Sequence, residues 1–456
     1  MNLVIPPALI SVLFLCIGAL VVLLLTNVLS RNSVVLATLG TVVLAFAVLP
    51  SLRADGATLA ATLTVVAAGI VAMLLLHSVE IEEPSQKPEI AALLLLGSAG
   101  GIVFATANDL LTAVIGLETL ALSSATLAAL SRGSRPVEAA FKYFVLGSIS
   151  VAVLLFGIGL VYLATGSFAW PTLAAADPAY RWLLLAGILL VGLGFAYELA
   201  LVPLHFGAVD VYTAGAPALT GFVMAASKVA AVIALSRLIA SVGQGLQGPL
   251  PLASVLIVIG LLSIVFGTFA ALAQTDLRRM LAYSAVANAG FLALALGCGA
   301  EGRAASVFYV VTYATTALLV FAALSGRGTG PLAFADVKLE GMGALRSLAL
   351  VLGLLSLAGI PPTPGFWAKL AVLHAAWTGL GAFGFWATLI AALGGVFGAL
   401  YYMKPLPALL SVVREAGVSR LPSSSTPAVV LAGAVVVFAA VAPGLVYLLA
   451  RLATGT

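Results

Sequence analysis

Charged residues are scarce in this sequence. They account for 8% of its 456 residues, whereas a typical soluble domain has about 25%. Hydrophobic residues account for 63%, and the mean hydropathy is +1.22. Apolar runs of about eighteen residues or more recur from end to end of the chain. The composition therefore excludes a soluble globular protein and indicates a polytopic helical membrane protein.

Cysteine and histidine are also rare. The two cysteines, Cys16 and Cys298, lie in apolar runs, and the three histidines are far apart in the chain, so we expect no disulfide, no haem and no metal site. The sequence lacks a glycine-rich dinucleotide fingerprint, a phosphate loop and a cysteine cluster for iron–sulfur ligation. We therefore expect no cofactor in this chain. The net charge of +4 forms no basic block, which argues against nucleic acid as a partner.

The apolar runs predict an all-α fold with about fourteen transmembrane helices. The first run has no basic segment before it and no cleavage site, so we interpret it as a spanning helix. Asp109 and Asp276 stand where helix N-caps are expected. We expect spans at residues 4–28, 34–50, 57–77, 90–106, 109–130, 137–164, 182–204, 216–240, 251–273, 278–298, 305–325, 346–376, 381–403 and 427–450.

Two of these spans carry prolines in their interior. Glu198, Pro203 and His205 lie within eight residues in the seventh span, and Pro361 and Pro362 lie in the twelfth. A proline inside a helix removes a hydrogen bond and clashes with the preceding turn. In lipid, the freed backbone groups are tolerated only where protein or trapped water satisfies them. We therefore expect helices 7 and 12 to be interrupted and to face protein or water.

The interrupted spans stand at matching positions, each fourth in a block of five. A block with an odd number of crossings places its successor upside down in the membrane, so the pattern predicts two inverted five-helix repeats, typical of transporters. We expect an N-terminal three-helix segment at 1–88, repeats at 89–240 and 250–405, and a C-terminal linker and last helix at 406–456. The sequence shows no residue-by-residue repeat between the two blocks.

Basic residues in the loops predict the orientation in the membrane. One side collects twelve of them: Arg31, Lys87, Arg132, Arg135, Arg278, Arg279, Arg327, Lys338, Arg346, Lys404, Arg414 and Arg420. The other side collects Arg53, Arg181, Arg237, Arg303 and Arg451. The excess places the first set in the cytoplasm and both termini outside.

Five ionisable residues interrupt the apolar spans: Glu118, Lys142, Glu198, Lys228 and Lys369. A charge at the bilayer centre costs about 3 kcal/mol on insertion scales, so each must be paired, hydrated or neutralised. A Glu beside a Lys has a proton affinity that depends on the state of its partner. A row of such groups joined by water can pass protons, and we predict proton translocation through these residues and His205.

Each of these residues also has a structural interpretation. Glu118 can form a structural ion pair, and Lys142 can extend along the apolar surface to the interface. Glu198 can simply pair with Lys228, and His205 can satisfy carbonyls freed by the helix break.

Several motifs are similar to those of a known family, the antiporter-like membrane subunits of respiratory complex I, and most closely to its subunit N. The stretches that carry the resemblance are 137–148 with 165–167, 202–205 with 210–212 and 215–217, 227–230, 281–284, and 355–362 with Gly365, Phe366 and Lys369. They span about residues 90–405.

The resemblance implies fourteen helices with two inverted repeats, and proton translocation driven by quinone reduction elsewhere in the complex. The family's glutamate of span five falls on Glu118, and its lysines of spans six, eight and twelve fall on Lys142, Lys228 and Lys369. Three features depart from the family. Glu198 replaces a lysine five residues before Pro203, Asn288 replaces a histidine, and the stretch after His205 lacks the usual tryptophan and proline.

The function predicted is that of a proton-translocating subunit of a complex I-type NADH:quinone oxidoreductase, multi-pass in the inner membrane. Quinone, FMN and iron–sulfur clusters are expected in partner subunits, and the partners are other membrane subunits and the lipid bilayer. In this interpretation Glu118 and Lys142 form an ion pair that tunes Lys228. The alternatives are a subunit of a multi-subunit cation/proton antiporter, the membrane arm of a hydrogenase- or ferredoxin-linked relative, and a scaffold that no longer pumps.

Overall fold

The computed structural model describes residues 6–25, 33–81, 86–170, 178–243, 251–338, 344–415 and 426–455. Within these ranges the chain is built from helices, with two isolated antiparallel β-bridges. The first half holds α1 (Pro7–Leu25), α2 (Ser33–Val48), α3 (Gly56–Leu74), α4 (Lys87–Thr106), α5 (Leu110–Ala129), α6 (Ser134–Thr165), α7 (Arg181–Tyr197), α8 (Phe206–Ala214) and α9 (Pro217–Gly243). The second holds α10 (Pro251–Leu272), α11 (Leu277–Leu296), α12 (Gly299–Ala323), α13 (Ala344–Ala358), α14 (Pro364–Gly379), α15 (Gly384–Met403), α16 (Leu406–Glu415), α17 (Thr426–Val441) and α18 (Pro443–Thr454).

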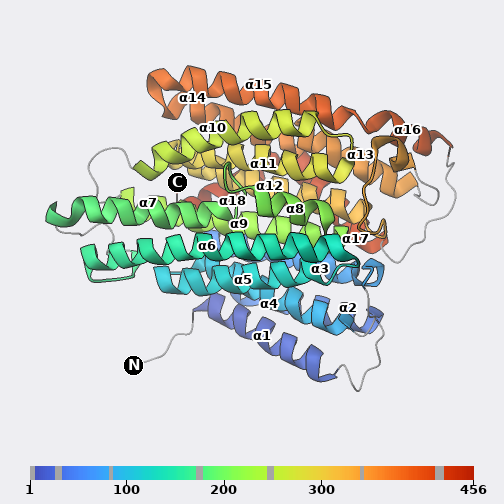
Figure 1. The fold of residues 1–456 in the computed structure, drawn as a ribbon, viewed down its shortest axis with the longest axis horizontal. Helices are drawn as coiled ribbons and strands as arrows, with labels where there is room; N and C mark the ends of the chain where they lie inside the picture. The colour runs from blue at the N-terminus through green and yellow to red at the C-terminus, as the bar shows by residue number, and fades with distance from the viewer. Residues whose placement is uncertain are drawn as a thin grey trace.

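The helices run roughly side by side along one direction of the bundle (Figure 1). Eleven spans in the described ranges are long and apolar enough to cross a membrane, counting α2 together with the turn that follows it. The interrupted crossings are α7 with α8 and α13 with α14, because α7 and α13 each end where a proline-containing segment begins. The bent pair α17–α18 completes the set.

The last crossing differs from the sequence prediction. A single continuous helix over 427–450 is wrong, because α17 and α18 meet at an angle of 91°. Ala442 lies between them with φ −122° and ψ 52°, outside the helical region, and Pro443 opens α18. Proline lacks an N–H and is disfavoured inside a helix but suits a helix start. The chain therefore turns at this proline.

Aspartates begin three helices. Asp109 Oδ1 accepts the N–H of Thr112 at the start of α5, and Asp276 Oδ1 accepts the N–H of Arg279 at the start of α11. Both predicted N-caps are therefore confirmed. Asp55 does the same for α3, accepting from the N–H of Thr58. Each carboxylate satisfies a backbone donor that the first turn of a helix leaves free.

The two five-helix blocks share details that the sequence did not reveal. Asp109 forms an antiparallel bridge with Ala169 in the segment after α6, and Asp276 forms one with Ala333 in the segment after α12. Because α4–α9 and α10–α15 each make five crossings, the second block begins on the opposite side from the first. The two blocks therefore match in their order of helices and in the position of these bridges.

Small residues let the first helices of each block approach closely. A Cβ at Gly116 of α5 would clash with the backbone N of Phe104 in α4, and a Cβ at Gly290 of α11 would lie 2.7 Å from the backbone N of Ile264 in α10. Lipid tails are as apolar as the helix surfaces, so the hydrophobic effect does not drive helices together in a membrane. They associate through close van der Waals packing instead. Glycine is therefore required at these two crossings.

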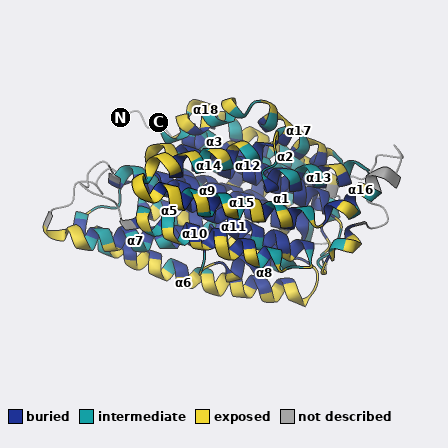
Figure 2. Cartoon of the chain, turned by 90° about the horizontal axis from the view of Figure 1, so that it is seen from above, coloured by how far each residue is buried: buried dark blue, intermediate teal, exposed yellow. Residues whose placement is uncertain are grey.

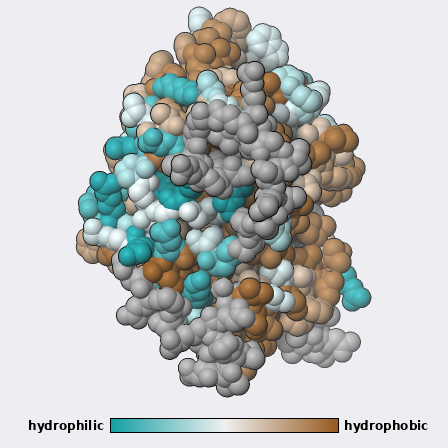
Figure 3. Space-filling model, turned by 90° about the vertical axis from the view of Figure 1, so that its right-hand side faces the viewer, coloured by the Kyte–Doolittle hydropathy of each residue, from teal (hydrophilic) through white to brown (hydrophobic). Residues whose placement is uncertain are grey.

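The charged site lies among the innermost helices. Helices α9, α11 and α12 are almost wholly buried, whereas α1, α2, α6 and α15 expose most of their apolar surface. Figure 2 shows this contrast of buried centre and exposed perimeter. Figure 3 shows that hydrophilic residues gather at one end of the bundle, while apolar residues line its flank. Exposed basic residues of the set expected in the cytoplasm include Arg132, Arg135, Arg279 and Lys404.

Candidate functional site

The first helix break exposes backbone carbonyls that a lysine binds. α7 ends at Tyr197, and Ala200 has φ 62°, in the left-handed region that alanine rarely adopts. Lys228, fully buried in α9, places its Nζ 2.5 Å from the carbonyl oxygen of Leu199 and 5.8 Å from the ring centre of Tyr212. The negative end of the α7 dipole and the aromatic face both favour a cation here.

The second break repeats this arrangement. Gly359 has φ 80° after α13, and Lys369 of α14 donates to the carbonyl oxygens of Leu357 at 2.8 Å and Ala358 at 3.0 Å. Its Nζ lies 5.7 Å from the ring centre of Phe291. In each break the lysine bonds the carbonyl oxygen of the residue that precedes the left-handed residue. The left-handed residue, Ala200 or Gly359, stands three positions before a proline that follows a cis peptide bond.

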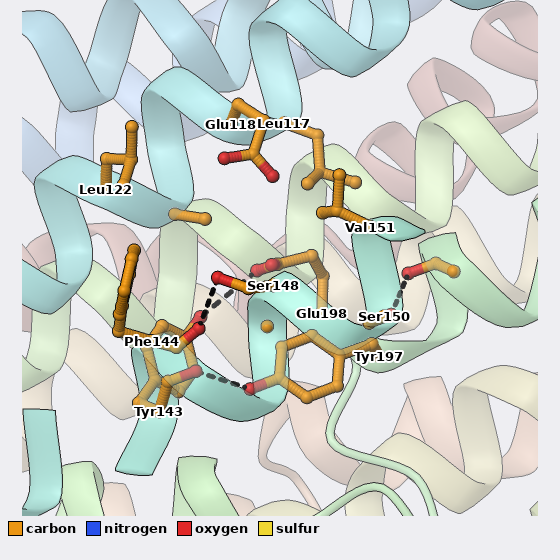
Figure 4. A pocket seen from close by; sticks show the side chains of 13 residues that line it. Leu117, Glu118, Leu122, Tyr143, Phe144, Ser148, Ser150, Val151, Tyr197 and Glu198 are labelled. Atoms are coloured by element: carbon orange, nitrogen blue, oxygen red, sulfur yellow. Dashed lines mark hydrogen bonds between the residues drawn. The ribbon is translucent and has the colours of Figure 1, made fainter. Parts of the chain in front are cut away.

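A small cavity lies between α5, α6 and α7, and two glutamates line it (Figure 4). Its volume is about 20 Å³, enough for about one water molecule. Glu118 enters from α5, and Glu198 enters from the end of α7. The structure therefore brings together two carboxylates that are 80 residues apart in sequence.

Tyrosines from α6 and α7 hold one side of this cavity. The Tyr143 hydroxyl donates to Glu198 Oε2 at 3.3 Å, and the Tyr197 hydroxyl donates to the carbonyl oxygen of Tyr143 at 2.9 Å. Glu198 is 3% exposed, and its Oε1 makes no hydrogen bond to the described residues. One carboxylate oxygen is thus anchored, and the other has no hydrogen-bond partner among the described residues.

The proposed ion pair between Glu118 and Lys142 is wrong. Lys142 Nζ lies 2.7 Å from Glu138 Oε1 and 3.4 Å from Asp210 Oδ2, and half of its side-chain surface is exposed. Successive side chains on a helix point about 100° apart. Because Tyr143 faces inward to Glu198, Lys142 faces the outer surface between α6 and α8.

His205 is buried, and neither of its ring nitrogens hydrogen-bonds the described residues. Its ring packs against Phe206 and Phe266, with ring centres 4.2 and 4.8 Å away. The freed backbone groups of the break are taken up elsewhere, since Ser263 Oγ accepts the N–H of Val202 at 2.9 Å. The Leu199 carbonyl oxygen is bonded by Lys228, while the Pro203 backbone acts on the His205 ring, so a role of His205 in satisfying freed carbonyls stays a prediction.

Hydroxyl groups connect the two lysine sites across the centre of the molecule. The Tyr313 hydroxyl contacts Met224 Sδ, one turn before Lys228, at 3.1 Å. Tyr313 also lines a cavity of about 10 Å³ with Ser356 and Leu357, whose carbonyl oxygen accepts from Lys369. The space is at the lower limit for one water molecule. Sequence reasoning missed Tyr143, Tyr313 and Ser356, because a hydroxyl in an apolar run carries no distinctive pattern.

Asn288 closes one wall of this central cavity. Its Nδ2 donates to the Ser284 carbonyl oxygen at 2.7 Å and to the Tyr402 hydroxyl at 3.1 Å, and its Oδ1 accepts from the Tyr309 hydroxyl at 2.5 Å. These bonds tie α11 to α12 and α15.

Comparisons with known proteins agree with this geometry. Residues 107–396 match the family model described as NADH:quinone oxidoreductase/Mrp antiporter, TM. NADH-quinone oxidoreductase subunit N of Laribacter hongkongensis is 36% identical over 367 residues, which are 78% of this chain and 74% of the relative.

Solved structures of respiratory membrane complexes share the fold. A chain of respiratory complex I from Thermus thermophilus with bound aureothin superposes with a TM-score of 0.81 at 29% identity, over 96% of this chain and 98% of that one. A chain of the Mrp complex from Dietzia sp. DQ12-45-1b has a TM-score of 0.82 at 20% identity, over 100% and 97%, and shows the fold alone. This chain therefore belongs to the NADH:quinone oxidoreductase/Mrp antiporter transmembrane family, among its complex I subunit N members.

Proposed function

We propose that this chain is a proton-translocating membrane subunit of a complex I-type NADH:quinone oxidoreductase in a bacterial inner membrane. The observation that carries the proposal is the pair of lysines, Lys228 and Lys369, each bonded to carbonyls of a broken helix inside the bundle. A hydroxyl-lined cavity lies between them. Broken helices whose ends meet ions near the centre of a bundle are a recurring feature of transporters.

Each residue of the site has a role in this proposal. Glu138, Lys142 and Asp210 form an entry cluster on the surface near the start of α6, within reach of protons from the cytoplasm. Glu118 and Glu198 pass protons inward to Lys228. The lysines hold them between the two halves, because an amine can donate to a carbonyl whether it is charged or neutral.

Lys369 is the exit site in this scheme, and His205 packs the first break. Quinone, FMN and iron–sulfur clusters belong to partner subunits, and electron transfer there drives the conformational changes that alter lysine proton affinity. The chain contributes the proton path to the enzyme complex.

The test is proton pumping by the assembled complex in membrane vesicles, measured with NADH as donor. Lys228→Met removes the ammonium while keeping most of the side-chain volume, and we expect pumping per NADH to fall at least tenfold. Lys87→Met, at the start of α4 and away from the two breaks, is the matched control and is expected to pump normally. Undiminished pumping by Lys228→Met would reject the proposal.

We also propose that both termini face the periplasm and that residues 1–88, 89–240, 250–405 and 406–456 form the segments expected from the sequence. The exposed basic residues Arg132, Arg135, Arg279 and Lys404 support a cytoplasmic position for the helix ends that carry them. A phosphatase that is active only in the periplasm, fused after Thr456, is expected to be active. An inactive fusion with normal complex assembly would reverse the orientation.

A further inference from the structure

The cavity between α5, α6 and α7 holds two acids without a basic partner. Neither Glu118 nor Glu198 lies within 4.0 Å of a lysine, arginine or histidine nitrogen in the described residues. Tyr143 supplies a hydrogen bond to Glu198 Oε2 only. Glu198 is 97% buried, and its Oε1 has no hydrogen-bond partner among the described residues.

Two ionised carboxylates in this position would be unfavourable. Like charges that share a buried site are not ionised together, and one carboxyl takes up a proton. A buried carboxylate without a cation is also costly, so the group neutralises. The titratable groups that face Glu198 are Glu118 of α5, Tyr143 of α6, Tyr197 of α7, Tyr212 of α8 and Lys228 of α9. The lysine is already bonded to the Leu199 carbonyl oxygen.

The size of the cavity decides how the acids communicate. About 20 Å³ is enough for one water molecule, and a buried water needs two to four polar partners. Glu118, Glu198 and Ser148 line the same space (Figure 4). The Ser148 hydroxyl donates to the Phe144 carbonyl oxygen and keeps lone pairs free. One water can therefore bridge the two carboxyl groups.

We propose that Glu118 and Glu198 share a single proton through one bridging water, so that the pair stores one proton as a carboxylic acid. In the transfer, the O–H bond at Glu198 Oε1 breaks as its proton passes to the water. The water gives one of its own protons to a Glu118 oxygen, and no electrons change hands. This inference rests on the proposed function, because the stored proton serves the same path. The pair carries one negative charge whichever acid holds the proton.

The pair also explains how a glutamate can stand at position 198. A lysine at this position would place a permanent positive charge opposite Glu118. A glutamate has no positive charge, so the site balances one of its two negative charges by binding a proton. The first half of this chain is then a site that binds one exchangeable proton.

The test is infrared spectroscopy of the purified complex in lipid, in H₂O and D₂O, read at the C=O stretch of protonated carboxyl groups. Glu198→Gln is expected to remove one deuterium-sensitive band completely, because Glu118, the less buried of the two acids, then ionises. Glu118→Gln is expected to shift the same band, because Glu198 keeps the proton but loses its charged acceptor. Glu301→Gln, an exposed acid paired with His374, is the control and leaves the band unchanged.

A second variant keeps both acids. Ala121→Val narrows the cavity that Ala121 lines, and displacing the water should shift the band as Glu118→Gln does. If the band does not shift in either Glu118→Gln or Ala121→Val, the proton is held by Glu198 alone and the inference is overturned. A band that remains in Glu198→Gln would also overturn it. Pumping by Lys228→Met tests the proposed function separately, because it measures proton transport while both acids remain in place.

Discussion

At the scale of single residues, a lysine bonds the free carbonyl oxygens at each of the two helix breaks. A helix that stops inside a membrane leaves carbonyl oxygens that water would otherwise bind. Lys228 takes up the carbonyl of Leu199, and Lys369 takes up those of Leu357 and Ala358. The groups that hold each break together are therefore the groups proposed to carry protons, and a change in lysine position alters both.

Ala200 has a left-handed backbone conformation, which costs an alanine about 1–2 kcal/mol. Glycine adopts it freely but loses more entropy on folding. We expect Ala200→Gly to stabilise the complex by up to about 1 kcal/mol, measured by thermal unfolding in detergent. Ala226→Gly, in the buried interior of α9, is the control and is expected to destabilise by about 1 kcal/mol. Destabilisation by both would show that Ala200 is not strained.

His205 is enclosed by aromatic rings. If packing is its role, His205→Phe should keep at least half of the pumping rate, while His205→Ala should lower stability by about 3 kcal/mol by leaving a void. Pumping and thermal unfolding are measured on the same preparations. Loss of pumping in a stable His205→Phe complex would instead assign the imidazole to the proton path.

At the scale of elements, helix ends and helix crossings position the site. The N-caps of α5 and α11 and their bridges fix where the helices carrying Glu118 and Asn288 begin. Close packing at Gly116 fixes the distance between α4 and α5. A helix that shifts by a fraction of a turn would move its polar residue out of the cavity, so these contacts determine the geometry of the path.

The glycine at the α4–α5 crossing gives a direct test of this dependence. A methyl group at Gly116 meets the backbone of Phe104, which cannot move aside as a side chain can. Gly116→Ala should therefore destabilise the complex by about 1–3 kcal/mol, as overpacking does. Gly159→Ala in α6, where a Cβ meets nothing within 4 Å, should be neutral or stabilise by about 1 kcal/mol. Equal effects in thermal unfolding would contradict the packing argument.

The cap of α3 predicts a pH dependence. Partial burial acts to raise the pKa of Asp55, but hydrogen bonds from the N–H and hydroxyl of Thr58, with Arg237 nearby, outweigh it and hold the pKa below its usual value. The stability from this cap is therefore present above about pH 4, the unfolded value, and is lost as pH falls through the lower folded pKa.

Asp55→Ala should cost about 1 kcal/mol at neutral pH. Asp55→Asn keeps an acceptor for the Thr58 N–H and should remove the acid dependence with little loss at neutral pH. Hydrogen exchange at the start of α3, followed between pH 3 and 7, reads both effects. An unchanged acid response in Asp55→Asn would assign it to another group.

At the scale of the whole molecule, two inverted halves meet at a hydroxyl-lined centre. Tyr313 lies between Met224, next to Lys228, and the cavity that reaches the Leu357 carbonyl bonded by Lys369. The family's histidine is replaced by Asn288, which holds α11, α12 and α15 together. We therefore expect proton transfer between the halves to depend on hydroxyls and water.

Tyr313→Phe removes the hydroxyl at this junction and leaves the ring in place. We expect pumping per NADH to fall several-fold, while electron transfer from NADH to an artificial acceptor continues, because the redox groups lie in partner subunits. Tyr162→Phe on the exposed side of α6 is the matched control. Full pumping by Tyr313→Phe would exclude this hydroxyl from the path.

The sequence by itself determined the membrane-embedded all-α fold, the fourteen crossings, the two interrupted helices and the N-caps at Asp109 and Asp276. These features follow from local patterns of apolar runs, prolines and capping residues, whose physics acts within a few turns. The sequence also marked Glu118, Glu198, Lys228 and Lys369, since a charge in lipid is costly wherever it points.

Only the tertiary structure decided which of these groups meet. The side of α6 on which Lys142 and Tyr143 lie, the shared cavity of Glu118 and Glu198, and the hydroxyls between the two lysines depend on helix rotation and packing. The bend at Pro443 also needed the fold, because proline can open a helix as well as break one. Rotation is set by contacts between segments far apart in the chain, which local patterns do not encode.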